Sequence, residues 1–170
     1  SDNIITYLEN EFGTLGSSLL SNDIREARNL EREIFKSWCN WLCRKSISYL
    51  DQSFRKNKFK ESILKLEKIL SSSLTGYIDS PKHNSEKSGP GTGDIIFIPY
   101  IERINASLSY YKGFNLRKNY PFIDRWLTLL ERLSAYIGTQ GDFHTHVHDL
   151  PPQMGGCFKE VNDQQISFSN

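Results

Sequence analysis

Three of the four histidines stand at alternate positions in one short stretch, GDFHTHVHDLPPQMGGC, residues 141–157. If that stretch is extended, His144, His146 and His148 face the same way, with neighbouring pairs roughly 6.6 Å apart and the outer pair roughly 13 Å apart. Two imidazoles at the shorter spacing suit one zinc ion, but the outer two are too far apart for all three to surround one ion on a straight backbone. A third ligand would have to be Asp142, Asp149 or Cys157.

The alternative for these histidines is structural. A short His-rich stretch alone is a compositional signal and does not identify a metal site. We therefore predict no metal site, and expect the rings to hydrogen-bond backbone carbonyls and to stack against the rest of the protein. In that role they would tie down an irregular C-terminal tail.

A second candidate is the pair Cys39 and Cys43, whose spacing of four places both thiols on one face of a helix. Such a pair could be redox-active or bind a soft metal, but the sequence indicates no further ligand nearby. Unpaired cysteines are mostly small buried hydrophobic residues, so we expect these two to pack in the interior. The three cysteines form no CxxC motif, and their odd number argues against a disulfide framework and favours a reducing compartment.

The glycine-rich segment GPGTGD, residues 89–94, could cradle a phosphate ahead of a helix. Nucleotide-binding fingerprints of this kind follow a strand, whereas a polar loop precedes this one. We therefore predict a structural role, in which Gly91 or Thr92 caps the next helix and Asp94 accepts the free N–H groups of its first turn. Pro99 lies in the same helix, lacks the N–H that would bond to Ile95, and is expected to kink it.

Size and charge limit the functions that these residues could serve. A chain of 170 residues is long enough to bury one hydrophobic core. Its formal net charge of +1 gives no general reason to expect nucleic acid or a membrane surface as partner. No run of about 18 apolar residues occurs, and the first 20 residues have no basic start. The sequence therefore predicts neither a transmembrane helix nor a signal peptide.

Four segments have the apolar periodicity of helices. The first covers roughly residues 24–50, and the second carries its apolar face over 59–70 and ends near Gly76. The third, which begins near Asp94, is apolar nearly all round and is expected at the centre of the bundle. The fourth begins at Pro121, a residue suited to the first helical position, and closes at Gly138. No segment alternates apolar and polar residues over several positions, so the predicted fold class is all-α.

Two connecting segments lack this periodicity. Residues 79–93 are rich in Pro, Gly, Ser and charge, and indicate an exposed loop, because the helices on both sides need each other to bury their apolar faces. After Gly138 the periodicity is lost, which predicts an irregular tail. Its last part, residues 158–170, is polar and is expected to fray.

The opening SDNIITYLENEF carries a Ser, an Ile three residues later and a Tyr-Leu pair six and seven residues later, namely Ser1, Ile4, Tyr7 and Leu8. In this pattern it resembles the soluble glutathione S-transferase superfamily, where a Glu-Ser pair followed by the same residues closes the glutathione-binding domain. The resemblance implies that Ser1 contributes to binding glutathione. The Glu of the family's Glu-Ser pair would be the residue before Ser1.

The block GDIIFIPYIERINASLSYYKGFNLRKNYPFIDRWLTLLERLSAYIGTQ adds a second likeness to the same superfamily. In the helical domain of that family, an Asp starts a central buried helix, a Pro and a charged pair follow, and a later helix carries Pro and then Trp. The matching residues here are Asp94, Pro99, Glu102, Arg103, Pro121 and Trp126. The family usually has Ser or Thr three residues before the Asp, where this chain has Gly91. The GPGTGD loop and the His-rich ending are similar to a branch of the superfamily found in oxygenic phototrophs.

The resemblance implies a domain organisation. Residues 1–12 would end a thioredoxin-like domain of about 80 residues, residues 13–140 would form the C-terminal helical domain, and residues 141–170 the His-rich tail. The thioredoxin-like domain supplies the group that activates the glutathione thiol in this family, and the chain has no β-rich segment to form it. We therefore expect this chain to be the substrate-side part of a longer, cytoplasmic or plastid protein and to be inactive alone. The resemblance also suggests a homodimer.

For the parent protein the resemblance implies attack of a glutathione thiolate on an electrophile or a disulfide. It places the wall for an apolar substrate on the helix that carries Trp38, Trp41 and Leu42, with Arg44 or Lys45 able to meet an anionic group. Core packing is the alternative for each of the aromatic residues. The alternative for the whole chain is a non-catalytic helical interaction module, with a contact surface around Pro151, Pro152 and Met154.

Overall fold

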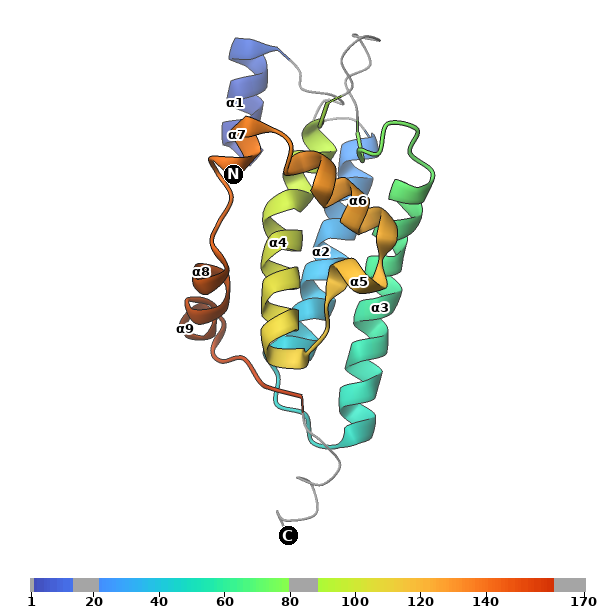
Figure 1. Cartoon of the computed structure of the whole chain (residues 1–170), viewed down its shortest axis with the longest axis vertical. Helices are drawn as coiled ribbons and strands as arrows, with labels where there is room; N and C mark the ends of the chain where they lie inside the picture. Colours follow the sequence, from blue (N-terminus) through green and yellow to red (C-terminus); the bar gives the residue numbers. More distant parts are fainter. Residues whose placement is uncertain (1, 14–21, 80–88, 161–170) are drawn as a thin grey trace.

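The computed structural model describes residues 2–13, 22–79 and 89–160, and all the regular structure in these ranges is helical. The three long helices are α2 (Asn22–Leu42), α3 (Tyr49–Ser71) and α4 (Thr92–Lys112), which lie side by side (Figure 1). The short helices α5 (Leu116–Asn119) and α6 (Pro121–Leu130) cover one side of them, because α6 packs on α3 and α5 packs on α4. The predicted all-α class is therefore confirmed for the described part of the chain.

Four further helices complete the described structure. Helix α1 (Asp2–Phe12) lies at one end of the molecule (Figure 1), and α7 (Ser134–Ile137) follows α6 in the chain. Helices α8 (Phe143–His148) and α9 (Leu150–Met154) pack on each other, and α8 packs on α4. None of the helices in the described ranges is long and apolar enough to cross a membrane.

The core forms where α2, α3, α4 and α6 meet. All three tryptophans of the chain are fully buried there, together with Phe59 and Phe97. The Trp38 indole donates to the Ser107 hydroxyl at 3.1 Å, which joins α2 to α4 inside the core. As the sequence predicts, α4 is central, because it contacts α2, α5 and α8.

A buried carboxylate fixes the start of α4. Asp94 is 0% exposed, and its two oxygens accept N–H groups from Ile78 (2.8 Å), Asp79 (3.1 Å) and Gly91 (2.9 Å), and the Trp126 indole N–H at 2.7 Å. The capping role predicted for Asp94 is confirmed, and of the two candidate cap residues, Gly91 and Thr92, the structure has Gly91. Its partners differ from the prediction: only Gly91 belongs to the cap of α4, and the other donors come from the preceding loop and from α6.

Glycine is required at position 91 because the backbone of Asp79 approaches Gly91 closely. Its φ of −106° is open to any residue, but an added Cβ would stand 1.9 Å from the Asp79 carbonyl oxygen. This contact explains why the chain has glycine where the resemblance predicts Ser or Thr. The helix then continues through Pro99 to Lys112.

The predicted boundaries of three helices are wrong. The helix expected over 24–50 ends at Leu42, because Ser48 starts a new helix by accepting the Asp51 N–H at 3.1 Å, while Asp51 accepts the Ile47 N–H at 3.2 Å. The helix expected from Pro121 to Gly138 is split into α6 and α7. The second predicted helix stops at Ser71, five residues before Gly76.

The tail is more regular than predicted. Asp142 caps α8 by accepting the N–H and the hydroxyl of Thr145, at 2.9 and 2.7 Å. Val147 and Leu150 then bury their side chains against the bundle. Two apolar residues are too few to produce a periodic pattern, which is why the sequence did not indicate these helices. The end of the tail, residues 161–170, lies outside the described residues.

Candidate functional site

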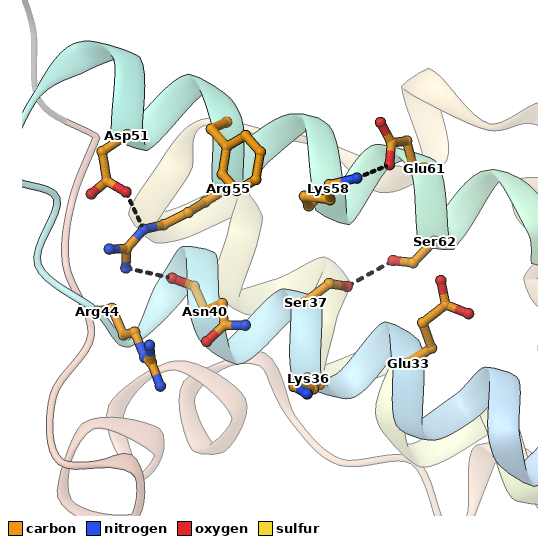
Figure 2. Close-up of a pocket in the computed structure, with 11 residues that line it drawn as sticks. Glu33, Lys36, Ser37, Asn40, Arg44, Asp51, Arg55, Lys58, Glu61 and Ser62 are labelled. Carbon is orange, nitrogen blue, oxygen red and sulfur yellow. Dashed lines mark hydrogen bonds and ion pairs between the residues drawn. The ribbon is translucent and has the colours of Figure 1, made fainter.

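A groove of about 450 Å³ runs between α2 and α3 (Figure 2). From α2 it is lined by Glu33, Lys36, Ser37 and Asn40, and Arg44 follows in the connection to α3. The facing side of the groove comes from α3, with Asp51, Phe54, Arg55, Lys58, Glu61 and Ser62. The Phe54 ring is 62% exposed, so the groove has one apolar side chain among polar ones.

Hydrogen bonds across the groove hold the two helices together. The Ser37 and Ser62 hydroxyls lie 2.7 Å apart, and the Arg55 guanidinium donates to the Asn40 carbonyl oxygen at 3.1 Å (Figure 2). Arg55 also pairs with Asp51 at 2.8 Å, and this hydrogen bond lowers the pKa of the Asp51 carboxyl. These contacts make the groove a preformed feature of the helix pair.

The charges of the groove favour an anionic ligand. Its three carboxylates are already paired: Asp51 with Arg55, Glu61 with Lys58 at 2.8 Å, and Glu33 with Lys65 at 2.7 Å. Within the described residues, Lys36 and Arg44 have no ion-pair partner. A ligand in the groove would therefore meet two cations whose charges are not neutralised by neighbouring carboxylates.

A second cavity, of about 410 Å³, lies on the other side of the same stretch of α2. Lys36, Asn40 and Arg44 line both cavities. The remaining walls of the second cavity are less polar, and they are formed by Phe35, Cys39, Cys43 and Met154. Met154 belongs to α9, so the tail helps to shape this cavity, which we call the thiol cavity.

The tail also brings the third cysteine, Cys157, close to Cys43. The Phe158 N–H donates to the Leu42 carbonyl oxygen at 2.9 Å, which sets Cys157 beside Cys43. Cys39 lies one helical turn before Cys43, whose backbone N–H donates to the Cys39 carbonyl oxygen at 2.8 Å. All three cysteines are half-buried and free of disulfides, and Cys39 and Cys43 line the cavity.

Lys112 of α4 lies near Cys43 and Cys157. Its side chain is 1% exposed, its Nζ is 3.9 Å from a Glu160 carboxylate oxygen, and burial lowers the pKa of its ammonium group. Burial also raises the pKa of Cys157 to about 12. A hydrogen bond from Cys43 lowers the pKa of Cys39, and the same bond raises the pKa of Cys43.

The residues expected to line a substrate site fall elsewhere. Trp38, Trp41 and Leu42 are 1%, 0% and 0% exposed, so they pack in the core and line neither cavity. Lys45 is exposed in the connection between α2 and α3, and it lines neither of the two cavities. Arg44, its predicted alternative as an anion contact, lines both. Ser1, the predicted glutathione contact, lies outside the described residues.

The histidines are on a helix, which corrects the extended geometry considered from the sequence. His144 and His148 are one turn apart on α8, with ring centroids separated by 4.3 Å. The His146 ring lies against Gly141, in a different cavity from the two described above. In the described ranges, no three His, Cys, Asp or Glu side chains come close enough to hold a metal ion.

Several residues of the site could not be identified from the sequence. Ser37, Asn40 and Ser62 are polar residues on amphipathic helices, and nothing in their spacing distinguishes them from an ordinary solvated face. The contact of Cys157 with Cys43 joins residues far apart in the chain, through a tail predicted to be irregular. The sequence feature that did point toward this site was the i, i+4 spacing of Cys39 and Cys43.

No protein-family model matches the chain, and no curated protein is significantly similar to it. The likeness to glutathione S-transferases therefore rests on the motifs of the sequence.

Proposed function

We propose that this chain is the substrate-side helical domain of a glutathione S-transferase-like protein, and that α1 docks a thioredoxin-like, glutathione-binding domain. The observation that carries the proposal is an apolar face on α1. Ile4, Tyr7, Leu8 and Phe12 are 64%, 61%, 42% and 82% exposed, and their spacing puts them on one side of the helix.

Such a face favours a partner. An isolated helix of 11 residues is marginally stable in water, and it is usually held by the packing of its apolar face. In the described part of the chain, α1 makes no extensive contact with another helix. The face lies in the segment whose residues match the family motif that closes the glutathione-binding domain, and this is why we choose that domain as the occupant.

In this proposal the substrate lies against α2, on its surface rather than on its buried face. Phe35 and Met154 would contact the apolar part of the substrate, and Lys36 and Arg44 its anionic part. The docked domain would supply glutathione and the group that lowers the pKa of its thiol, and the thiolate would attack an electrophile or a disulfide. Glutathione would thus be the co-substrate of the parent protein.

The test compares two preparations. The native protein, purified from its source cells with an antibody to this chain, is assayed beside the isolated 170-residue chain, with glutathione and either 1-chloro-2,4-dinitrobenzene or 2-hydroxyethyl disulfide. We expect the native protein to turn over at least one substrate and the isolated chain to turn over neither. Equal activity of the two would overturn the proposal, because the chemistry would then lie within this chain.

A variant of the native-length protein tests the docking face. Phe12→Ser should lower the melting temperature of the two-domain protein, whereas Leu74→Ser, at a side chain that is 100% exposed, should not. Equal melting temperatures for both variants would contradict a buried role for α1.

The alternative, a non-catalytic interaction module, is supported by the same exposed face of α1. The surface first suggested for it, around Pro151, Pro152 and Met154, is less suitable, because Met154 lines the thiol cavity and packs against the core. A native protein that is inactive on both substrates, and that copurifies in equal amounts with another protein only while the α1 face is intact, would favour the module.

A further inference from the structure

The connection between α2 and α3 gathers exposed apolar side chains at one end of the molecule. Four of them fall within eight residues: Ile47, Tyr49, Leu50 and Phe54 are 88%, 52%, 78% and 62% exposed. Apolar residues scattered singly over a surface are normal, whereas a cluster of them marks a contact with a partner. The connection lies at the lower end of Figure 1, and α1 lies at the upper end. This cluster is therefore separate from the docking face of α1, and it goes beyond the proposed function.

Side-chain bonds fix the backbone that carries the cluster. Ser48 accepts the Asp51 N–H at 3.1 Å, and Asp51 accepts the Ile47 N–H at 3.2 Å. Arg55 pairs with Asp51 at 2.8 Å and donates to the Asn40 carbonyl oxygen at 3.1 Å, which ties the start of α3 to α2. The apolar side chains are thus exposed on an ordered backbone.

Positive charge is concentrated at the same end. Residues 44–58 contain five Lys or Arg side chains and one carboxylate, in a chain whose net charge is +1. Three of the five cations are paired with carboxylates, in the pairs Arg55–Asp51, Lys56–Glu160 and Lys58–Glu61. The other two, Arg44 and Lys45, are exposed and have no ion-pair partner in the part of the chain that the structure describes. Two cations are therefore available beside the apolar cluster.

The spacing along α3 orders these groups by depth. Leu50, Phe54 and Lys58 follow one another at intervals of four residues, so they share one face and are roughly 6 Å apart along the helix axis. The Lys58 Nζ lies 5.9 Å from the centre of the Phe54 ring. Apolar side chains therefore stand nearest the end of the molecule, and the cation stands behind them. A membrane interface has the same order, because apolar groups enter it by about 5–10 Å while cations stay with the headgroups.

We propose that this corner, residues 44–58, docks the chain on an anionic lipid surface. Leu50 and Phe54 enter the boundary between the headgroups and the acyl chains. Arg44 and Lys45 attract the anionic headgroups. A nucleic acid would use the cations but would leave the aliphatic Leu50 in water, because its contacts are made by phosphates and by stacked bases. Since none of the described helices could span a membrane, docking of this kind holds the chain on the surface.

The first experiment is cosedimentation of the 170-residue chain with two kinds of vesicle, one of phosphatidylcholine alone and one that contains about one-third phosphatidylserine. We expect binding to the anionic vesicles at low ionic strength, and several-fold weaker binding when the salt concentration is raised to about 0.5 M. Binding to the neutral vesicles should be weak. No binding to the anionic vesicles, or equal binding to both kinds, would overturn the proposal. Neither result depends on a thioredoxin-like domain, so this test is independent of the proposed function.

Apolar variants test the part of the surface that enters the membrane. Leu50→Ser and Phe54→Ser should each lower the affinity for the anionic vesicles several-fold, because less apolar area is buried in the lipid. Leu74→Ser is the matched control, since this side chain is 100% exposed and lies beyond the other end of α3. All three positions are exposed, so circular dichroism should show an unchanged helix content. An equal effect of the control would contradict the role of the corner.

Charge variants test the contribution of the two cations. The double variant Arg44→Gln and Lys45→Gln should lower the affinity for the anionic vesicles about tenfold or more. The control double variant Lys68→Gln and Lys118→Gln removes the same charge at exposed positions outside the corner, and should have a much smaller effect. Equal losses for the two double variants would show attraction by net charge alone and would overturn docking through this corner.

A fluorescent variant tests insertion itself. The three natural tryptophans are fully buried, so the indole introduced by Leu50→Trp would report on the corner. Its emission should shift to shorter wavelength on the anionic vesicles, and brominated lipids should quench it. Unchanged emission from vesicle-bound protein would overturn the proposal, because charge alone would then hold the chain at the surface, as expected for a site that binds nucleic acid or an acidic protein.

Discussion

The indole N–H of Trp126 on α6 donates to a carboxylate oxygen of Asp94, at the start of α4, over 2.7 Å. This bond joins two helices through a fully buried carboxylate that also accepts three backbone N–H groups. Burial raises the pKa of Asp94, while the four donors oppose that shift by favouring the charged form.

Replacing Asp94 by Ala should destabilise the protein severely. The substitution leaves four donors without this acceptor, and two of them, the Gly91 N–H and the Trp126 indole N–H, belong to buried hydrogen bonds. Each unsatisfied buried group costs about 1–3 kcal/mol, so we expect a loss of about 3 kcal/mol or more in the free energy of unfolding. Trp126→Phe removes one donor and keeps an aromatic ring, and should cost less than Asp94→Ala. Urea unfolding followed by circular dichroism measures both. A loss below about 1 kcal/mol for Asp94→Ala would show that the carboxylate does not hold the helices together.

Gly91 and Gly89 offer a matched pair within one loop. An added Cβ at Gly91 would stand 1.9 Å from a backbone oxygen, whereas at Gly89 it would meet nothing within 4 Å. We predict that Gly91→Ala lowers the free energy of unfolding by about 1–3 kcal/mol, the usual cost of overpacking. Gly89→Ala should change it little. The same melting temperature for both variants would contradict the close approach of Asp79 to the start of α4.

Trp38 should contribute to stability rather than to ligand binding in the isolated chain. Its indole is 1% exposed and bonded to Ser107, so Trp38→Ala should lower the free energy of unfolding by about 3–5 kcal/mol. Lys45→Ala, at an exposed position, should leave it within about 0.5 kcal/mol of the original value. A Trp38→Ala variant with unchanged stability would restore the substrate-lining role that the sequence suggested.

The start of α8 should depend on pH through Asp142. Its hydrogen bonds to Thr145, first of all that from the backbone N–H, lower the pKa of the Asp142 carboxyl below the ordinary 3.8. A carboxyl with a lowered pKa contributes its full stabilisation above the ordinary value and loses it as the pH falls through the folded pKa. The Thr145 amide signal, followed by NMR, should therefore titrate with a midpoint below 3.8. A midpoint above that value would contradict the cap.

The periodicity of the sequence predicted the all-α class, the central position of α4 and the capping role of Asp94, because these features depend on local spacing. Helix ends were less predictable, since Ser48 and Asp51 start α3 through single side-chain bonds within an unbroken amphipathic pattern. The candidate site was less predictable still. The approach of Cys157 to Cys43 depends on how the tail folds back on α2, and the burial of Trp38 and Trp41 depends on which face of α2 meets α4.

The size of the native protein in its source cells, measured by immunoblot with an antibody to this chain, tests the central claim most directly. If α1 docks a thioredoxin-like domain on the same polypeptide, the band should exceed 19.7 kDa by about 9 kDa, the mass of a small domain of that kind. A single band at 19.7 kDa would contradict the account.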